Sequence, residues 1–193
     1  MATVFMFPGQ GSQSIGMGAG LFERYPGLVA EADAVLGYSI KELCLKDPDD
    51  KLKRTDYTQP ALYVVDSLSY LAKVEDEKIR PDFVIGHSLG EYAALYAAGA
   101  FDFSVGLKLV QKRGALMNAA TGGGMAAILG MTGDAVASAL AELGAGSIDV
   151  ANFNSPGQTV ISGPKADIET FAPELTDKGA RRVVILPVSG AFH

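Results

Sequence analysis

Two short apolar runs, each closed by a glycine, constrain the fold of this chain more than any other feature of its sequence. Val4–Phe7 is followed by Pro8-Gly9, and Asp82–Ile85 is followed by Gly86. Runs of this length that end at such breakers favour buried β-strands. Apolar residues recur at roughly helical spacing in several other segments: 25–36, 40–45, 58–74, 91–98 and 104–120. Strands that alternate with helices favour an α/β fold, in which helices cover both faces of a parallel sheet.

The segments between these elements have simpler interpretations. The charged segment 46–56 is expected to be a solvated loop. Thr58-Gln59-Pro60 is expected to begin the next helix, because proline is tolerated in a first helical turn. Gly122-Gly123-Gly124 is expected to be a flexible joint.

The segment after this joint has a different order of elements. The sequence predicts, in turn, a strand, a helix, two strands, a helix and a strand: 125–130, 134–143, 148–153, 158–162, 165–178 and 182–186. The β-α-β-β-α-β order is ferredoxin-like. We therefore predict an α/β large domain over residues 1–121, which closes again at 187–193, and an inserted α+β small domain over residues 122–186.

Composition excludes several classes of function. The 193 residues carry a formal net charge of −6, which disfavours an extended nucleic-acid surface. One cysteine and two histidines make a poor zinc site, so we expect no metal and no organic cofactor, and Cys44 is expected to be buried or inert. No apolar run approaches the roughly 18–20 residues of a membrane span. Without a basic stretch at the N-terminus, a cytoplasmic location is expected.

Gly86-His87-Ser88-Leu89-Gly90 matches the G-x-S-x-G pattern of a nucleophile turn. It lies between a predicted strand and a predicted helix, where a sharp turn lifts the serine hydroxyl above the sheet edge. At the helix start, the backbone N–H of Leu89 is expected to face a developing oxyanion. The alternative is a chance match in a glycine-rich chain, and the strand–helix setting favours Ser88 as a nucleophile.

A serine nucleophile needs a base, and only His87 and His193 are available. Neighbouring side chains in such a turn point apart, so His87 is a poor candidate for a base acting on Ser88. By elimination we predict His193 as the base, although a lone loop histidine is more often simply exposed to solvent. No acidic third member of a triad stands out.

The loop Gly9-Gln10-Gly11-Ser12-Gln13 follows the first predicted strand. Ser14 and Met17 stand where nucleotide-binding loops need glycine and lysine, so a phosphate cradle is excluded. Such a loop can supply a second oxyanion donor, and we assign that role to the Gln10 backbone. A plain tight turn is the alternative.

Arg113 lies in the helix predicted over residues 104–120. It shares one helical face with three apolar residues, and this stripe is expected to face the core: Val105, Leu109 and Leu116. Burying a guanidinium without an anion is costly. The arginine is therefore either a snorkelling or salt-bridged structural residue, or a bidentate clamp for a substrate carboxylate. Periodicity alone leaves both possibilities open.

Five motifs in this order resemble the malonyl-CoA:acyl carrier protein transacylases and the related acyltransferases of polyketide synthases. They run from the first predicted strand to the last residue: Phe7-Pro8-Gly9-Gln10-Gly11-Ser12-Gln13, Gly86-His87-Ser88-Leu89-Gly90-Glu91, Gln111-Lys112-Arg113-Gly114, Asn152-Phe153-Asn154-Ser155-Pro156-Gly157-Gln158 and Gly190-Ala191-Phe192-His193. The resemblance implies a hydrolase-like parallel-sheet domain with an inserted ferredoxin-like α+β domain. The last motif is similar to that of free-standing acyltransferases that serve polyketide synthases.

The resemblance also implies a ping-pong reaction on malonyl-CoA and an acyl carrier protein. Ser88 would take the malonyl group, His193 would act as base, and Leu89 and Gln10 would form the oxyanion hole. Arg113 matches the family arginine that holds the malonyl carboxylate, and Phe192 would crowd an α-methyl branch. The acidic carrier is expected to dock on basic residues, for which Lys112 and Arg181 are candidates.

Family members continue beyond the position of His193 with further strands and helices of the larger domain. The parallel sheet of this chain is therefore expected to lack strands and to expose apolar surface. Two alternatives to malonyl transfer remain: an acyl hydrolase that clears carrier-bound thioesters, and a truncated carrier-docking fragment without turnover.

Overall fold

The computed structural model describes residues 2–193, and contacts within the chain divide it into two compact units. Unit 1 ends at Leu116 and unit 2 begins at Met117. This boundary lies close to the one that the sequence predicts at residues 121 and 122. Residues 187–193 fall within unit 2 by their contacts, and their predicted return to the large domain stays a prediction.

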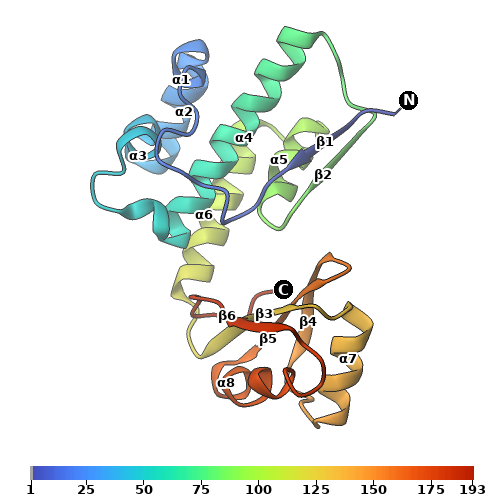
Figure 1. Cartoon of the computed structure of the whole chain (residues 1–193). Helices are drawn as coiled ribbons and strands as arrows, with labels where there is room; N and C mark the ends of the chain where they lie inside the picture. The colour runs from blue at the N-terminus through green and yellow to red at the C-terminus, as the bar shows by residue number, and fades with distance from the viewer. Residues whose placement is uncertain (1) are drawn as a thin grey trace. The chain divides into compact units, whose positions relative to one another are not determined.

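Unit 1 contains a small parallel sheet and several helices (Figure 1). Its strands are β1 (Val4–Phe7) and β2 (Phe83–Gly86). Its helices are α1 (Leu21–Arg24), α2 (Pro26–Leu36), α3 (Ile40–Lys46), a 3-10 turn (Lys51–Lys53), α4 (Thr55–Glu77), α5 (Gly90–Ala97) and α6 (Phe103–Ala119), the last of which ends in unit 2.

The two strands pair in parallel, from Val4 opposite Phe83 to Phe7 opposite Gly86. Phe7 is buried in the core of unit 1, and the neighbouring Phe5 and Val84 pack against that core. Four apolar side chains of the same strands are exposed: Val4 at 46%, Met6 at 74%, Phe83 at 63% and Ile85 at 49%. The prediction of two buried strands is therefore wrong for one face, against which no helix packs among residues 2–193.

Helix α4 begins at Thr55, earlier than the predicted start at Thr58. The Thr58 hydroxyl lies 2.5 Å from the Leu52 carbonyl oxygen and 2.8 Å from that of Arg54, to which it can donate. Pro60 therefore lies inside the helix rather than in its first turn. Part of the predicted loop 46–56 is also helical, because the 3-10 turn Lys51–Lys53 precedes α4.

The predicted core-facing stripe of α6 is wrong. Val105 is 45% exposed, Leu109 46% and Leu116 60%. The buried residues of the helix lie on its other side: Phe103, Gly106, Leu107, Val110 and Gly114. The two glycines on this side allow close packing. Arg113 follows Gly106 and Val110 at helical spacing, so it lies at the edge of the buried face.

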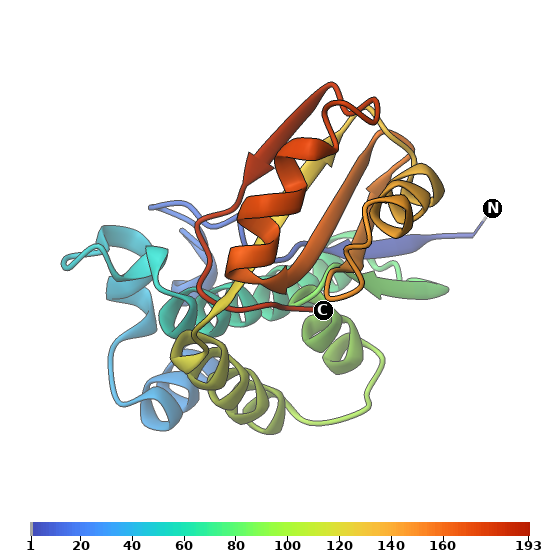
Figure 2. The ribbon, with the colours of Figure 1, turned by 90° about the horizontal axis from the view of Figure 1, so that it is seen from below.

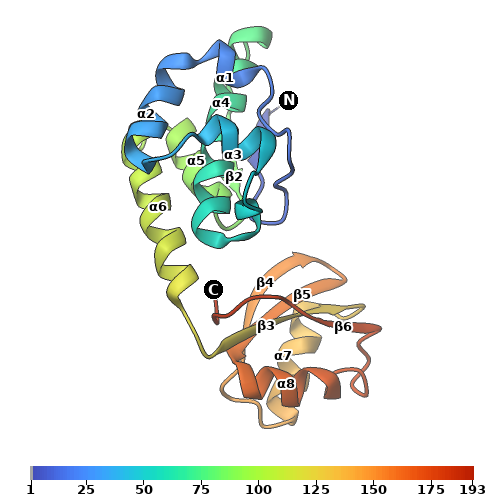
Figure 3. The ribbon, with the colours of Figure 1, turned by 90° about the vertical axis from the view of Figure 1, so that its left-hand side faces the viewer.

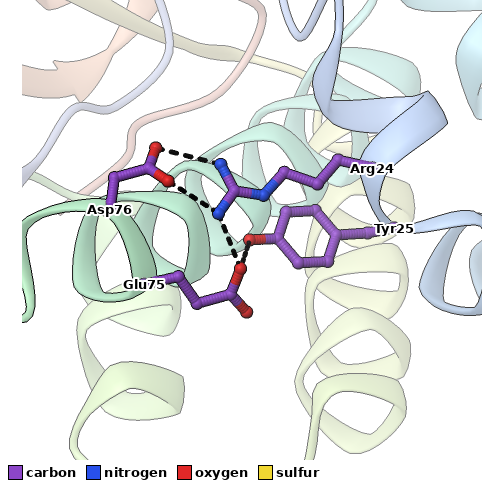
Figure 4. A network of polar contacts seen from close by, with 4 residues as sticks. All are labelled: Arg24, Tyr25, Glu75 and Asp76. Atoms are coloured by element: carbon purple, nitrogen blue, oxygen red, sulfur yellow. Dashed lines mark hydrogen bonds and ion pairs between the residues drawn. The ribbon is translucent and has the colours of Figure 1, made fainter.

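A polar network joins the α1–α2 segment to the end of α4 (Figure 4). The Arg24 guanidinium donates to both carboxylate oxygens of Asp76 and to Glu75, at distances from 2.7 to 2.9 Å. Tyr25 donates its hydroxyl to the same Glu75 at 2.8 Å. These hydrogen bonds hold the α1–α2 segment against the long helix.

Unit 2 has the element order that the sequence predicts. Its elements are β3 (Gly123–Leu129), α7 (Gly133–Glu142), β4 (Asp149–Ser155), β5 (Gln158–Pro164), α8 (Lys165–Glu174) and β6 (Arg182–Ile185). The strands form an antiparallel sheet in the order β4-β5-β3-β6. Both helices pack on the same face of this sheet (Figure 3).

Two predictions for unit 2 need correction. Gly123 and Gly124 are not a flexible joint, because they are buried residues of β3 that pair with Pro164 and Gly163. Helix α8 ends at Glu174 rather than at the predicted residue 178, and Pro173 stands at its last turn. Proline removes a backbone donor and disfavours helix in the residue before it, which limits the helix here.

The segment after β6 runs back along the start of β3 (Figure 2). The N–H of Gly123 donates to the carbonyl of Ser189 at 3.2 Å. Phe192, near the end of this segment, packs with Val184, Leu186 and Val188 against a small cluster on the sheet: Met125, Ala127 and Val160. The face of the sheet away from its helices therefore carries its own apolar layer.

Candidate functional site

Ser88 lies in the sharp turn between β2 and α5. Its φ is 52°, a left-handed conformation that is uncommon for a residue other than glycine. Hydrogen bonds from the His87 N–H to the Phe7 carbonyl and from the Gly90 N–H to the His87 carbonyl, both 3.0 Å, hold this conformation. Strained backbone of this kind costs on the order of 1–3 kcal/mol and is concentrated at functional sites.

The turn also requires glycine at position 86. A Cβ atom on Gly86 would lie 2.1 Å from the backbone nitrogen of Glu91. The strand end and the helix start can therefore approach this closely only when no side chain separates them. Gly86 is thus required by the turn that presents Ser88, and the role of Ser88 as a nucleophile stays a prediction.

The loop after β1 packs directly against the Ser88 turn. A Cβ atom on Gly9 would lie 2.4 Å from the His87 carbonyl oxygen. Ser12 closes the loop by donating its N–H and its hydroxyl to the Gly9 carbonyl, at 3.3 and 2.8 Å. Gln10 follows Gly9, and its side-chain amide donates to the Thr55 hydroxyl at 3.3 Å.

Leu89 is the residue that caps the N-terminus of α5, and its side chain is 1% exposed. The sequence therefore correctly places Leu89 at the helix start and Gln10 in the loop that contacts the turn. Their role as oxyanion donors stays a prediction.

Arg113 reaches from α6 to the nucleophile turn. Its Nη2 lies 3.1 Å from the Ser88 Oγ, and its Nη1 donates to the Gln59 Oε1 at 2.7 Å. The guanidinium carbon lies 5.9 Å from the centre of the Tyr92 ring. Burial lowers the pKa of Arg113, while Tyr92 and Glu91 oppose this shift.

Within residues 2–193, Arg113 forms no ion pair with a carboxylate. The interpretation of Arg113 as half of a structural salt bridge therefore has no support in this part of the chain. A half-buried guanidinium whose contacts are a hydroxyl, a neutral amide and an aromatic ring keeps its positive charge for an anion.

Gln59 also lies in the site, although no sequence pattern indicated a functional role for it. It lies in α4, its side chain is completely buried, and it accepts a hydrogen bond from Arg113. The available signal was a glutamine beside Pro60, directly before the apolar run that begins at Ala61. By itself this pattern indicates only the start of a helix.

His193 and Phe192 belong to unit 2, whereas Ser88 belongs to unit 1. His193 is exposed and has a φ of 63°, and Phe192 is partly buried. The pairing of His193 with Ser88 stays a prediction. His87 is exposed.

Residues 2–193 contain no group of three or more histidine, cysteine or acidic side chains able to hold a metal ion. No helix in the same residues is both long and apolar enough to span a bilayer. Cys44 is buried, as predicted, and burial raises the pKa of its thiol to about 12.

The fold and the site together define a class of protein. A parallel strand pair leads into a left-handed serine turn and a helix, which is the arrangement of α/β proteins with a nucleophile serine. The chain belongs to the acyl transferase domain family, whose model matches residues 4–193.

Individual members of this family are highly similar to the chain in sequence and in structure. The chain is 55% identical over 191 residues to the polyketide biosynthesis malonyl CoA-acyl carrier protein transacylase PksC of Bacillus subtilis, covering 98% of this chain and 66% of the relative. A crystal structure of malonyl CoA-acyl carrier protein transacylase from Burkholderia pseudomallei superimposes with a TM-score of 0.93 at 52% identity, covering 100% of this chain and 66% of that one.

A third relative is a malonyl-transacylase solved in complex with a type II polyketide synthase acyl-carrier protein. It superimposes with a TM-score of 0.87 at 38% identity, covering 99% of this chain and 64% of that one. The chain thus spans about two thirds of the length of these relatives.

Proposed function

We propose that this chain is an acyltransferase that moves a malonyl group from malonyl-CoA to the phosphopantetheine thiol of an acyl carrier protein. The malonyl group travels as an ester on Ser88. The observation that carries the proposal is the Arg113 guanidinium, held 3.1 Å from the Oγ of a left-handed Ser88. Relatives that carry this activity in their names, at up to 55% identity, support the same reading.

The proposed reaction has two matched halves. In the first, the Ser88 Oγ attacks the thioester carbonyl while His193 accepts the hydroxyl proton. The N–H groups of Leu89 and Gln10 donate to the oxyanion. The carbon–sulfur bond then breaks, and the coenzyme A thiolate takes the proton from His193. In the second half, His193 accepts the proton of the carrier thiol, and the thiolate attacks the ester carbonyl. The bond from that carbonyl to the Ser88 oxygen then breaks, and this oxygen takes the proton back from His193.

Arg113 supplies selectivity for the malonyl group in this proposal. Its guanidinium forms a bidentate pair with the free carboxylate, beside the ester oxygen of Ser88. An acetyl group would leave that buried charge without an anion, which penalises binding of the wrong acyl group. A hydrolase that clears varied acyl groups would gain nothing from such a clamp, so Arg113 favours transfer of malonyl over general hydrolysis.

Phe192 has the second specificity role in the proposal. Its ring is expected to crowd an α-methyl branch and so to disfavour methylmalonyl groups. The support is its place in Gly190-Ala191-Phe192-His193, next to the proposed base.

The fold assignment that accompanies this function is a hydrolase-like domain with a ferredoxin-like insert. Its support is the β-α-β-β-α-β element order of unit 2 together with the strand order β4-β5-β3-β6. Unit 1 contributes a parallel strand pair and the nucleophile turn.

The partners in the proposal are malonyl-CoA and an acidic acyl carrier protein, with no nucleic acid and no membrane. Lys112 and Arg181 are exposed and suit a carrier-docking role. The reaction needs no metal and no bound organic cofactor, because coenzyme A enters as part of the substrate. The cytoplasm stays the expected location.

Mass spectrometry of the intact chain tests the proposal. After incubation with malonyl-CoA, the wild-type chain should gain one malonyl group, and a carrier protein bearing phosphopantetheine should then remove it faster than water does. Ser88→Ala should abolish the label, because Ser88 is the one serine or threonine with a left-handed backbone among residues 2–193. A change at the exposed Ser138, Ser138→Ala, should keep the label. Loss of the label to water alone would identify a hydrolase, and an unlabelled wild-type chain would favour a docking fragment.

A further inference from the structure

The contact between Gln59 and Arg113 pairs a charged donor with a neutral acceptor. Gln59 is 0% exposed, and its Oε1 accepts from the Arg113 Nη1 at 2.7 Å. Buried arginines are usually oriented by carboxylates, which fix their geometry but also neutralise their charge. An amide oxygen fixes one edge of the guanidinium and leaves the positive charge uncompensated.

Hydrogen bonds of neighbouring residues anchor the part of α4 that carries Gln59. The preceding Thr58 can donate to carbonyls of the turn before it, and Pro60 follows in the same helix. Three residues further on, the Tyr63 hydroxyl donates to the Phe103 carbonyl at 3.0 Å. This hydrogen bond ties α4 to α6, so the helices that carry Gln59 and Arg113 are held in register.

The fixed positions of these two helices determine the direction of the Arg113 guanidinium. With Nη1 committed to Gln59, Nη2 points to the Ser88 Oγ at 3.1 Å. Rotation of the guanidinium about its own axis would break both contacts together. The direction of the Arg113 fork beside Ser88 therefore depends on Gln59.

We propose that Gln59 is a positioning residue that sets selectivity for acyl groups bearing a free carboxylate, because it orients Arg113 without neutralising it. The inference rests on the proposed malonyl transfer and deepens it. In this proposal Gln59 orients the guanidinium and has no chemical role of its own. Its effect is carried by Arg113, and it should differ between acyl groups with and without a carboxylate.

Two variants separate orientation from charge. Gln59→Met keeps a similar volume and removes the acceptor, so the guanidinium loses its fixed direction. Gln59→Glu keeps an acceptor and adds a negative charge that competes with the malonyl carboxylate for Arg113. Gln111→Met is the matched control, because Gln111 is a partly buried glutamine of α6 that donates to Val35 instead.

The measurement is the rate of Ser88 acylation by malonyl-CoA and by acetyl-CoA, followed by intact-mass spectrometry. Gln59→Met should slow malonyl loading by about 10-fold and Gln59→Glu by about 100-fold, the loss expected when a positioned group is displaced or blocked. Acetyl loading should change less than about twofold in both variants, and Gln111→Met should leave both rates near wild type.

A ratio of malonyl to acetyl loading rates that is the same in the Gln59 variants as in the wild type would overturn the positioning role, since a merely structural glutamine affects both rates alike. Thermal unfolding of each variant identifies a folding defect, and the ratio of the two rates remains interpretable in any variant that is still acylated. If neither Gln59 variant folds, Gln59 is a structural residue and the inference is wrong. If malonyl-CoA does not label the wild-type chain, the proposed function and this inference are both wrong. If the wild type is labelled but the Gln59 variants keep its ratio of malonyl to acetyl loading, the inference alone is wrong.

Discussion

At the scale of single residues, the proposed malonyl transfer depends on the positive charge of Arg113. The guanidinium is half-buried and is held by Gln59, Ser88 and Tyr92, none of which carries a negative charge. A buried cation without its anion is costly, so the site should bind an acyl group that supplies a carboxylate much better than one that does not.

Removing Arg113 tests this directly. Arg113→Ala should lower malonyl turnover by about 100-fold or more, because a charge-assisted bidentate contact is lost, and should lower acetyl turnover far less. Arg80→Ala, a change at an exposed arginine, serves as the control. Steady-state transfer assays with both acyl-CoA substrates measure the effect, and an equal loss for malonyl and acetyl would contradict the clamp.

Single residues also differ in how far the sequence could predict them. Ser88 was predictable because its turn needs glycine on both sides between a strand and a helix, and this pattern is local. Gln59 was not, because its role depends on a contact with Arg113 across 54 positions, and no local pattern encodes that contact. The predicted pairing of His193 with Ser88 would also require residues far apart in the sequence to meet, and it stays a prediction.

At the scale of helices and strands, the sequence predicted which elements exist better than which faces they bury. Most strands and helices lie within a few residues of their predicted positions. The stripe on α6 was wrong because apolar residues occur on two sides of that helix, and only the side with Gly106 and Gly114 allows another element to approach closely. Periodicity identifies an apolar face but cannot say which of two faces a neighbour will cover.

The contact between α1 and α4 gives a prediction at this scale. Arg24→Ala should lower the Tm of the chain by about 2 °C, a small effect because the network lies at the surface. Hydrogen bonds from Arg24 to Asp76, and from Tyr25 and Arg24 to Glu75, lower the pKa of both carboxyls. A depressed pKa adds stability above the ordinary values of 4.5 for Glu75 and 3.8 for Asp76, and this stability is lost as pH falls through the lower folded-state values.

Calorimetry at pH 7 and at pH 3 checks this prediction. The difference in Tm between Arg24→Ala and the wild type should shrink at the lower pH and should also shrink in high salt. Arg80→Ala again provides an exposed arginine outside the network. A difference in Tm that stays constant with pH and salt would assign the effect to packing of the Arg24 side chain instead.

At the scale of the whole molecule, the buried carboxyl of Asp66 makes the stability of the fold depend on pH. Asp66 of α4 is 8% exposed, and its Oδ2 has no hydrogen-bond partner within residues 2–193. Burial raises the pKa of this carboxyl from 3.8 to about 7. The folded chain therefore keeps the proton over a pH range in which the unfolded chain releases it.

This shift predicts that the chain loses stability as pH rises from about 4 to about 7, after which the penalty from Asp66 is constant. Asp66→Asn removes the titration and should stabilise the chain at pH 8 by on the order of 2 kcal/mol, with little difference from the wild type at pH 4. Asp149→Asn, a change at an exposed carboxyl, should show no such dependence. Urea unfolding at the two pH values measures the effect. If the stability difference between this variant and the wild type is the same at pH 4 and at pH 8, the ionised Asp66 carboxylate carries no burial penalty and the prediction is wrong.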